Sequence, residues 1–165
     1  MELHFQYEVL GEKQVGFTFK ELEVKVTDLR EPFAEIAQDY YEGEEKTFDE
    51  EGAFEGKPSW TPLSEDYAKR KKMIWGDMPI LVASGALKRA AVSNTADGSV
   101  FRLGKTDLAM GVNLPVGGWN LALLHQLGTR KMPSREVIRI TPPQEKRWIR
   151  SFRDFLWRKT KEAEK

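Results

Sequence analysis

The spacing of apolar residues changes along this chain, and this change constrains the fold more than any other feature. Apolar residues alternate with polar ones over residues 3–9 and again over residues 15–19, with a turn at Gly11 between them. A period of two is typical of half-buried strands. The sequence therefore predicts an N-terminal β-hairpin within residues 1–27. Alternation over residues 22–26 leaves open a third strand.

The spacing becomes helical after Asp28. Apolar residues recur every three or four positions over residues 29–42, and Asp28 with Glu31 has the pattern of a capping box. Near the other end, Thr141-Pro142-Pro143-Gln144 combines an N-cap, prolines for a first turn and a capping-box glutamine. An apolar stripe follows it. We therefore expect one helix over residues 29–42 and a long C-terminal helix over residues 144–160.

The segment between residues 43 and 59 is acidic and contains three glycines. We expect an acidic loop there, with room for one short helical turn near Phe48. Thr61-Pro62 predicts the start of a helix that runs through Arg70, because proline is favoured at the first helical position. A further short helix is expected over residues 85–91.

The second half of the chain contains short strands. Asp97-Gly98 is a strong hairpin turn, placed between residues 91–92 and 100–103. Further strands are expected over residues 108–112 and 137–140. A short apolar helix is expected to end at Gly128. With no repeat and no linker, residues 1–165 are expected to form a single α+β domain. In this domain an antiparallel sheet packs against several helices, and residues 60–165 form a basic helix and sheet core.

Length and composition exclude several classes of function. A chain of 165 residues has the length of one ordinary domain. Its apolar runs are too short to cross a membrane, and its first residues lack the features of a secretory signal. The absence of cysteine excludes disulfides, thiol catalysis and thiolate metal sites. Two histidines are too few for a histidine-rich zinc site.

The formal net charge of zero hides an asymmetry. Residues 1–59 contain 16 acidic and 6 basic residues, whereas residues 60–165 contain 10 acidic and 20 basic ones. Such a division is compatible with a basic surface for nucleic acid, with an acidic arm docked on a basic face, or with attraction between neighbouring subunits. Two differently charged solvated surfaces would produce the same count.

The motifs of common enzymes are absent from the sequence. His125 has no G-x-S-x-G elbow that would present Ser84 or Ser134 as a nucleophile, and a structural histidine is the simpler interpretation. The acidic residues between 39 and 55 lack the spacing of a calcium loop. The glycines match neither a dinucleotide fingerprint nor a P-loop. The sequence therefore predicts no catalytic residue, no metal and no cofactor.

Nucleic-acid binding has more support. The basic group of residues 69–72 lies near Trp60, Tyr67 and Trp75, and aromatic side chains among cations are suited to single strands. The C-terminal helix is basic on its outer face. A small nucleic-acid-binding protein that uses Lys69–Lys72 and this helix is therefore the alternative function.

Several segments, taken in order, resemble the virion morphogenesis family of tailed phages, the tail-completion proteins of Mu-like and P2-like phages. The segment through Trp60-Thr61-Pro62-Leu63-Ser64 into a basic helix resembles the family's "dG-x-x-W-x-P-L-S" run. Residues 80–87 resemble its "iL-x-x-t/sG-x-L" segment, residues 123–128 its "A-x-x-H-Q-x-G" helix end, and residues 132–135 its "m-P-a-R". The motif positions are Trp60, Pro62, Leu63, Gly85, Leu87, His125, Gln126, Gly128, Pro133 and Arg135. We expect most of them to be structural rather than contact residues.

The resemblance implies a non-enzymatic structural protein that completes the tail or joins tail to head as part of a connector ring. It would act in the virion, at the head–tail junction, after assembly in the cytoplasm of the bacterial host. Its partners would be other copies of itself and neighbouring head or tail proteins. The candidate assembly-surface residues are Arg70, Lys71, Lys72, Arg130 and Lys131. The chain departs from the family in its longer N-terminal hairpin and in residues 136–139, where the family usually has Pro-Phe-Leu-Gly.

Overall fold

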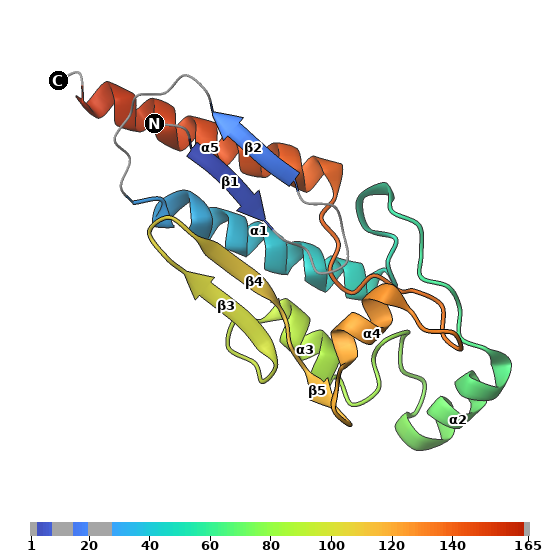
Figure 1. The fold of residues 1–165 in the computed structure, drawn as a ribbon. Helices are drawn as coiled ribbons and strands as arrows, with labels where there is room; N and C mark the ends of the chain where they lie inside the picture. Colours follow the sequence, from blue (N-terminus) through green and yellow to red (C-terminus); the bar gives the residue numbers. More distant parts are fainter. Residues whose placement is uncertain (1–2, 8–14, 20–27, 164–165) are drawn as a thin grey trace.

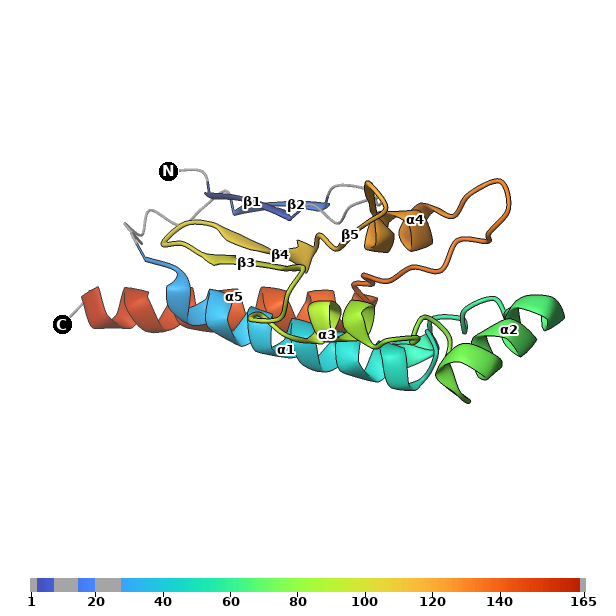
Figure 2. The same ribbon diagram turned by 90° about the horizontal axis from the view of Figure 1, so that it is seen from below.

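Two long antiparallel helices, α1 (Arg30–Asp49) and α5 (Pro142–Ala163), form one layer of the fold. The computed structural model describes residues 3–7, 15–19 and 28–163. Figure 1 shows α1 and α5 side by side, and Figure 2 shows paired strands covering one side of this helical layer. The prediction of a single α+β domain with antiparallel strands on helices and a long C-terminal helix is confirmed.

The strands of the described residues form three separate antiparallel pairs. Strands β1 (Leu3–Tyr7) and β2 (Val15–Phe19) make the expected N-terminal hairpin. Strands β3 (Ser99–Leu103) and β4 (Leu108–Val112) pair around Gly104, and the short strands β5 (Pro115–Val116) and β6 (Trp119–Asn120) form the third pair. The possible strand over residues 22–26 lies outside the described residues.

The expected loop over residues 43–59 is wrong in its first part, because α1 continues to Asp49. Gly43 does not break the helix. A Cβ atom at this position would overlap the side-chain amide of Gln144 on α5, so glycine lets the two helices approach closely. Glu44, Thr47 and Phe48 continue the buried face of α1 at helical spacing. Only after Asp49 does the chain turn, before the short 3-10 helix η1 (Phe54–Gly56).

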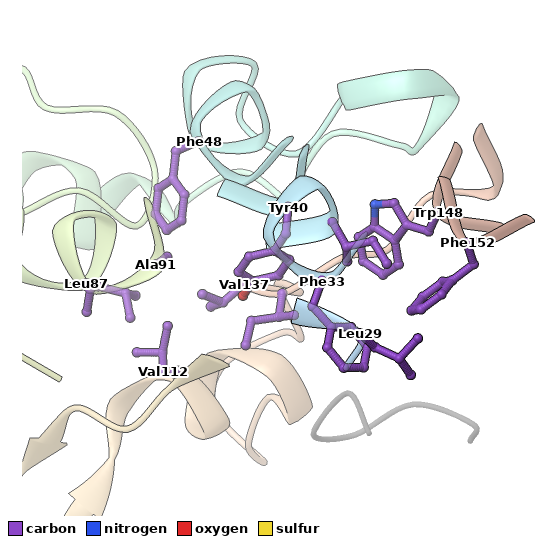
Figure 3. Close-up of a cluster of buried hydrophobic side chains, with 14 of the residues drawn as sticks. Leu29, Phe33, Tyr40, Phe48, Leu87, Ala91, Val112, Val137, Trp148 and Phe152 are labelled. Atoms are coloured by element: carbon purple, nitrogen blue, oxygen red, sulfur yellow. The ribbon is translucent and has the colours of Figure 1, made fainter. Parts of the chain in front are cut away.

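The core lies between α1, α5 and the β3–β4 pair (Figure 3). Phe33 of α1 packs edge-on against Phe152 of α5, with ring centroids 5.4 Å apart. Trp148 of α5 donates from its indole nitrogen to Asp39, at 2.7 Å. The helix α3 (Ala86–Val92) adds its buried residues Leu87, Ala90 and Ala91 to the same cluster.

The first turns of α5 and α1 are capped differently. At α5 the predicted capping box is present: Gln144 accepts from the Thr141 amide at 3.0 Å, and Thr141 Oγ1 accepts from the Gln144 amide at 3.2 Å. At α1 the predicted capping box is absent. Leu29 occupies the N-cap position, and Asp28 instead binds Arg30. Glu31 faces α5, where it pairs with Arg158.

Three expectations for the middle of the chain are corrected. Residues 91–92 end α3, so the Asp97-Gly98 turn leads from a helix into β3, whose partner is β4. The segment 137–140 bends at Val137 and Ile138 and forms no strand, because its backbone binds the side chain of Gln126. The helix expected at Thr61 begins at Glu65 instead.

Candidate assembly surface

An apolar cleft of about 650 Å³ lies between α2 (Glu65–Trp75) on one side and α4 (Leu121–Leu127) with β5 on the other. Its floor is made by residues 81–87, which lead into α3, and its rim by residues 62–64 and 131–133. The apolar lining includes Leu63, Leu81, Leu114, Leu121 and Met132. Both views show α2 at one end of the molecule, beyond the C-terminal end of α1 (Figures 1 and 2).

Helix α2 is held by its one buried residue, Lys71. The Lys71 ammonium group donates to the carbonyl oxygens of Met78 (2.7 Å) and Pro79, which lie beyond the end of the helix. Burial lowers the pKa of this group. Lys71 was expected as a cation of an assembly surface. It is only 6% exposed, lines the cleft and stabilises the turn that follows α2.

Apart from Lys71, the residues of α2 are exposed, apolar side chains included. Met73 is 79% exposed and Ile74 is 70% exposed; Tyr67 and Trp75 of the helix, and Met78 just after it, are also exposed. Large apolar residues grouped on a surface are a sign of a protein–protein contact. Helix α2 therefore presents to solvent the type of surface that a partner would cover.

The rim of the cleft is positioned by Arg135. Its guanidinium group donates to the carbonyl oxygens of Thr61 (2.7 Å) and Pro62 (3.0 Å), and its amide donates to the carbonyl of His125 (2.7 Å). Because Arg135 occupies the carbonyl groups of residues 61 and 62, the chain stays irregular there and α2 starts later than the Thr61-Pro62 pattern predicts. Arg135 is buried, so a structural role agrees with the expectation for this position.

His125 lines the cleft. Its ring is half-buried, and its Nδ1 atom has no hydrogen-bond partner among the described residues. Burial, with the charge of Arg135, lowers its pKa below the ordinary value, which favours the neutral imidazole at pH 7. His125 therefore contributes a neutral, largely apolar wall.

Two neighbouring motif residues serve the backbone. The buried side chain of Gln126 accepts from the amides of Val137 (2.8 Å) and Ile138 (3.0 Å) and donates to the Ile138 carbonyl (3.1 Å). This side-chain amide satisfies the backbone groups of residues 137–138 in place of a neighbouring strand. Gly128 has a φ of 71°, and a Cβ atom there would lie 2.6 Å from the Ser134 nitrogen, so only glycine fits.

The remaining motif residues also agree with structural roles. Trp60 is buried; its indole donates to the Glu136 carbonyl at 2.9 Å and its ring packs edge-on against Phe48. Leu87 belongs to the core. Gly85 has a left-handed backbone, with a φ of 78°, at the start of α3. Pro62, Leu63 and Pro133 lie at the cleft itself.

The other predicted cations lie on the surface, where we expected them. Arg70 and Lys72 are exposed on α2, and Arg130 and Lys131 are exposed in the turn that follows α4. Lys131 also lines the cleft. The structure therefore brings both groups to the same end of the molecule. Lys72 forms one exposed ion pair, with Asp77 at 3.2 Å.

The described residues contain no group of three His, Asp or Glu side chains that could hold a metal ion. No helix among them is long and apolar enough to cross a membrane.

The exposure of the apolar side chains of α2 is the feature that sequence patterns missed. The segment from Lys69 to Trp75 contains a cluster of cations followed by apolar residues, and the spacing gives no indication of which side chains are covered. Comparison of the chain with family models, curated proteins and solved structures gave no match.

Proposed function

We propose that this chain is a non-enzymatic structural protein of a tailed phage or prophage, which completes the tail or joins tail to head as one subunit of a connector ring. One observation carries the proposal: an exposed apolar helix and an apolar cleft lie together at one end of the molecule. Seven of the ten positions that carry the resemblance to the phage family line this cleft, namely Pro62, Leu63, Gly85, Leu87, His125, Pro133 and Arg135.

The distribution of charge suggests which surfaces of two neighbouring subunits meet. The exposed cations Arg70 and Lys72 lie on α2, whereas the exposed carboxylates Glu42, Glu45 and Glu50 lie at the end of α1 or just after it. Attraction between these two surfaces of different copies makes a heterologous contact, which can close into a ring. In this proposal the acidic surface is the second half of α1 rather than a loop. Neighbouring head or tail proteins would cover the remaining apolar surface in the virion.

Inactivation of the gene in its phage or prophage tests this function. We expect electron microscopy of the lysate to show separate heads and tails, because the junction would be incomplete. Supplying the wild-type gene in trans should restore joined particles. Normal virions from the inactivated phage would contradict the proposal.

Complementation with variants tests the surface. Ile74→Asp places a charge among the exposed apolar side chains of α2 and should fail to restore particles. Ala34→Asp, on the exposed face of α1 away from both surfaces, is the matched control and should restore them.

A further inference from the structure

The outer face of α5 carries a basic stripe that the proposed assembly surface does not use. We define it by its residues Lys146, Arg150, Arg153, Trp157 and Lys161, all exposed. They are four, three, four and four residues apart, a spacing that places them on one face of a helix. At 1.5 Å per residue the stripe extends for about 22 Å. It faces away from the buried stripe that includes Trp148 and Phe155.

The cations of the basic stripe are available to a partner. The side of α5 that faces α1 uses its arginines in ion pairs, Arg147 with Asp39 and Arg158 with Glu31. In contrast, no carboxylate of the described residues forms an ion pair with Lys146, Arg150 or Lys161. The α1 helix thus neutralises one side of α5 and leaves the opposite side positive.

Two further contacts concern the stripe. Arg153 pairs with Asp154 at 3.2 Å, but both side chains are exposed and such pairs contribute little. Trp157 is 63% exposed, and the Lys161 ammonium lies 5.1 Å from the centre of its ring. The stripe is therefore a row of cations with one aromatic side chain near its end.

We propose that the basic stripe of α5 binds the phosphate backbone of duplex DNA. A straight row of cations on a rigid helix suits the regularly spaced phosphates of a duplex. Single-strand binding relies on several aromatic side chains for successive bases, and the stripe has one. The inference is independent of the assembly surface, which lies on α2 and the cleft. It assigns to α5 alone the DNA contact that the sequence suggested for two basic segments.

The test is fluorescence anisotropy of a labelled duplex titrated with the purified chain. With four cations on phosphates, the logarithm of the binding constant should fall with the logarithm of salt concentration at a slope of about −3.6. Affinity should then weaken about 150-fold between about 50 and 200 mM salt. The stripe variant, in which Lys146, Arg150, Arg153 and Lys161 are all replaced by Gln, should lose at least about tenfold at the lower salt concentration.

A matched control separates the stripe from general charge. Replacing the exposed cations Arg30, Lys46, Arg102 and Lys105 by Gln removes the same charge elsewhere, and this variant should bind duplex almost as the wild type does. Circular dichroism confirms that both variants are folded.

Three results would overturn the proposal. The first is equal loss of binding in the stripe and control variants, and the second is tighter binding of a single strand of the same length. The third is no binding of the wild type to duplex at low salt, which would leave the stripe as a surface for an acidic protein.

Discussion

Replacement of Glu44 by Gln should remove a large pH dependence of stability. Glu44 lies in the core on α1 and is 1% exposed. One of its carboxylate oxygens accepts from the Arg139 amide at 3.2 Å, and the other has no partner among the described residues. Burial raises the pKa of Glu44 to about 8, against an ordinary value of 4.5, and the Arg139 contacts offset only part of this effect.

The sign follows from proton binding. Between pH 4.5 and about 8, the folded protein holds a proton on Glu44 that the unfolded chain has released. Stability is therefore fully present below pH 4.5 and is lost as the pH rises through this window. At about 1.36 kcal/mol per pH unit, the wild type should lose about 2 to 3 kcal/mol between pH 5.5 and 7.5 through this one group. The amide of Gln does not ionise and carries no such loss.

Urea unfolding at the two pH values, followed by circular dichroism, measures this effect. The free energy of unfolding of Glu44→Gln, relative to the wild type, should rise by about 2 to 3 kcal/mol from pH 5.5 to 7.5. Taking the difference cancels the other titrating groups, His125 included. Glu45→Gln, the exposed neighbour, is the control and should show no such change. A constant difference between Glu44→Gln and the wild type would refute the assignment of a protonated carboxyl in the core.

Three further substitutions test the packing. Gly43→Ala should destabilise the fold by about 0.5 to 2 kcal/mol in urea unfolding, because displacing the buried Gln144 amide costs more than the gain in helix propensity of about 1 kcal/mol; an unchanged midpoint would contradict this contact. Gln126→Leu leaves buried amides at residues 137–138 without an acceptor and should cost about 2 to 4 kcal/mol, and wild-type stability would show that the side chain does not hold this segment. Lys71→Met should weaken the local hold on α2 by about 1.5 to 3 kcal/mol, seen as faster chymotrypsin cleavage there; equal rates would oppose the anchoring role.

The sequence predicted an element correctly where its local capping or turn signals agree with its apolar spacing. Helix α5 has both its capping box and its apolar stripe, and the β1–β2 hairpin has an unbroken alternation. The helix was expected to end too early, at residue 42, because a glycine such as Gly43 can either end a helix or allow a second helix to approach closely. Only the position of α5 decides between them.

The remaining errors concern side chains that replace backbone partners. The segment 137–140 has the composition of a strand, but Gln126 supplies its hydrogen bonds from a distant helix. Lys71 belongs to a basic run that predicts exposure, yet it is buried because its ammonium group donates to two carbonyl oxygens of the turn after α2. At the candidate surface, the sequence motifs identified residues within 60–75 and 125–135. That these two segments line one cleft, and that Met73 and Ile74 are exposed, could be seen only in the fold.

The measurement that most directly tests the central claim, that the α2 and cleft surface joins copies of this chain, is the solution mass by light scattering over a wide range of concentration. We expect the mass of the wild type to rise above 19.0 kDa with concentration and to fall again at about 1 M salt, where screening weakens the charged contacts. Ile74→Asp should remain at the monomer mass throughout. A wild-type mass of 19.0 kDa at every concentration and salt level would contradict the claim, as would equal association by the wild type and Ile74→Asp.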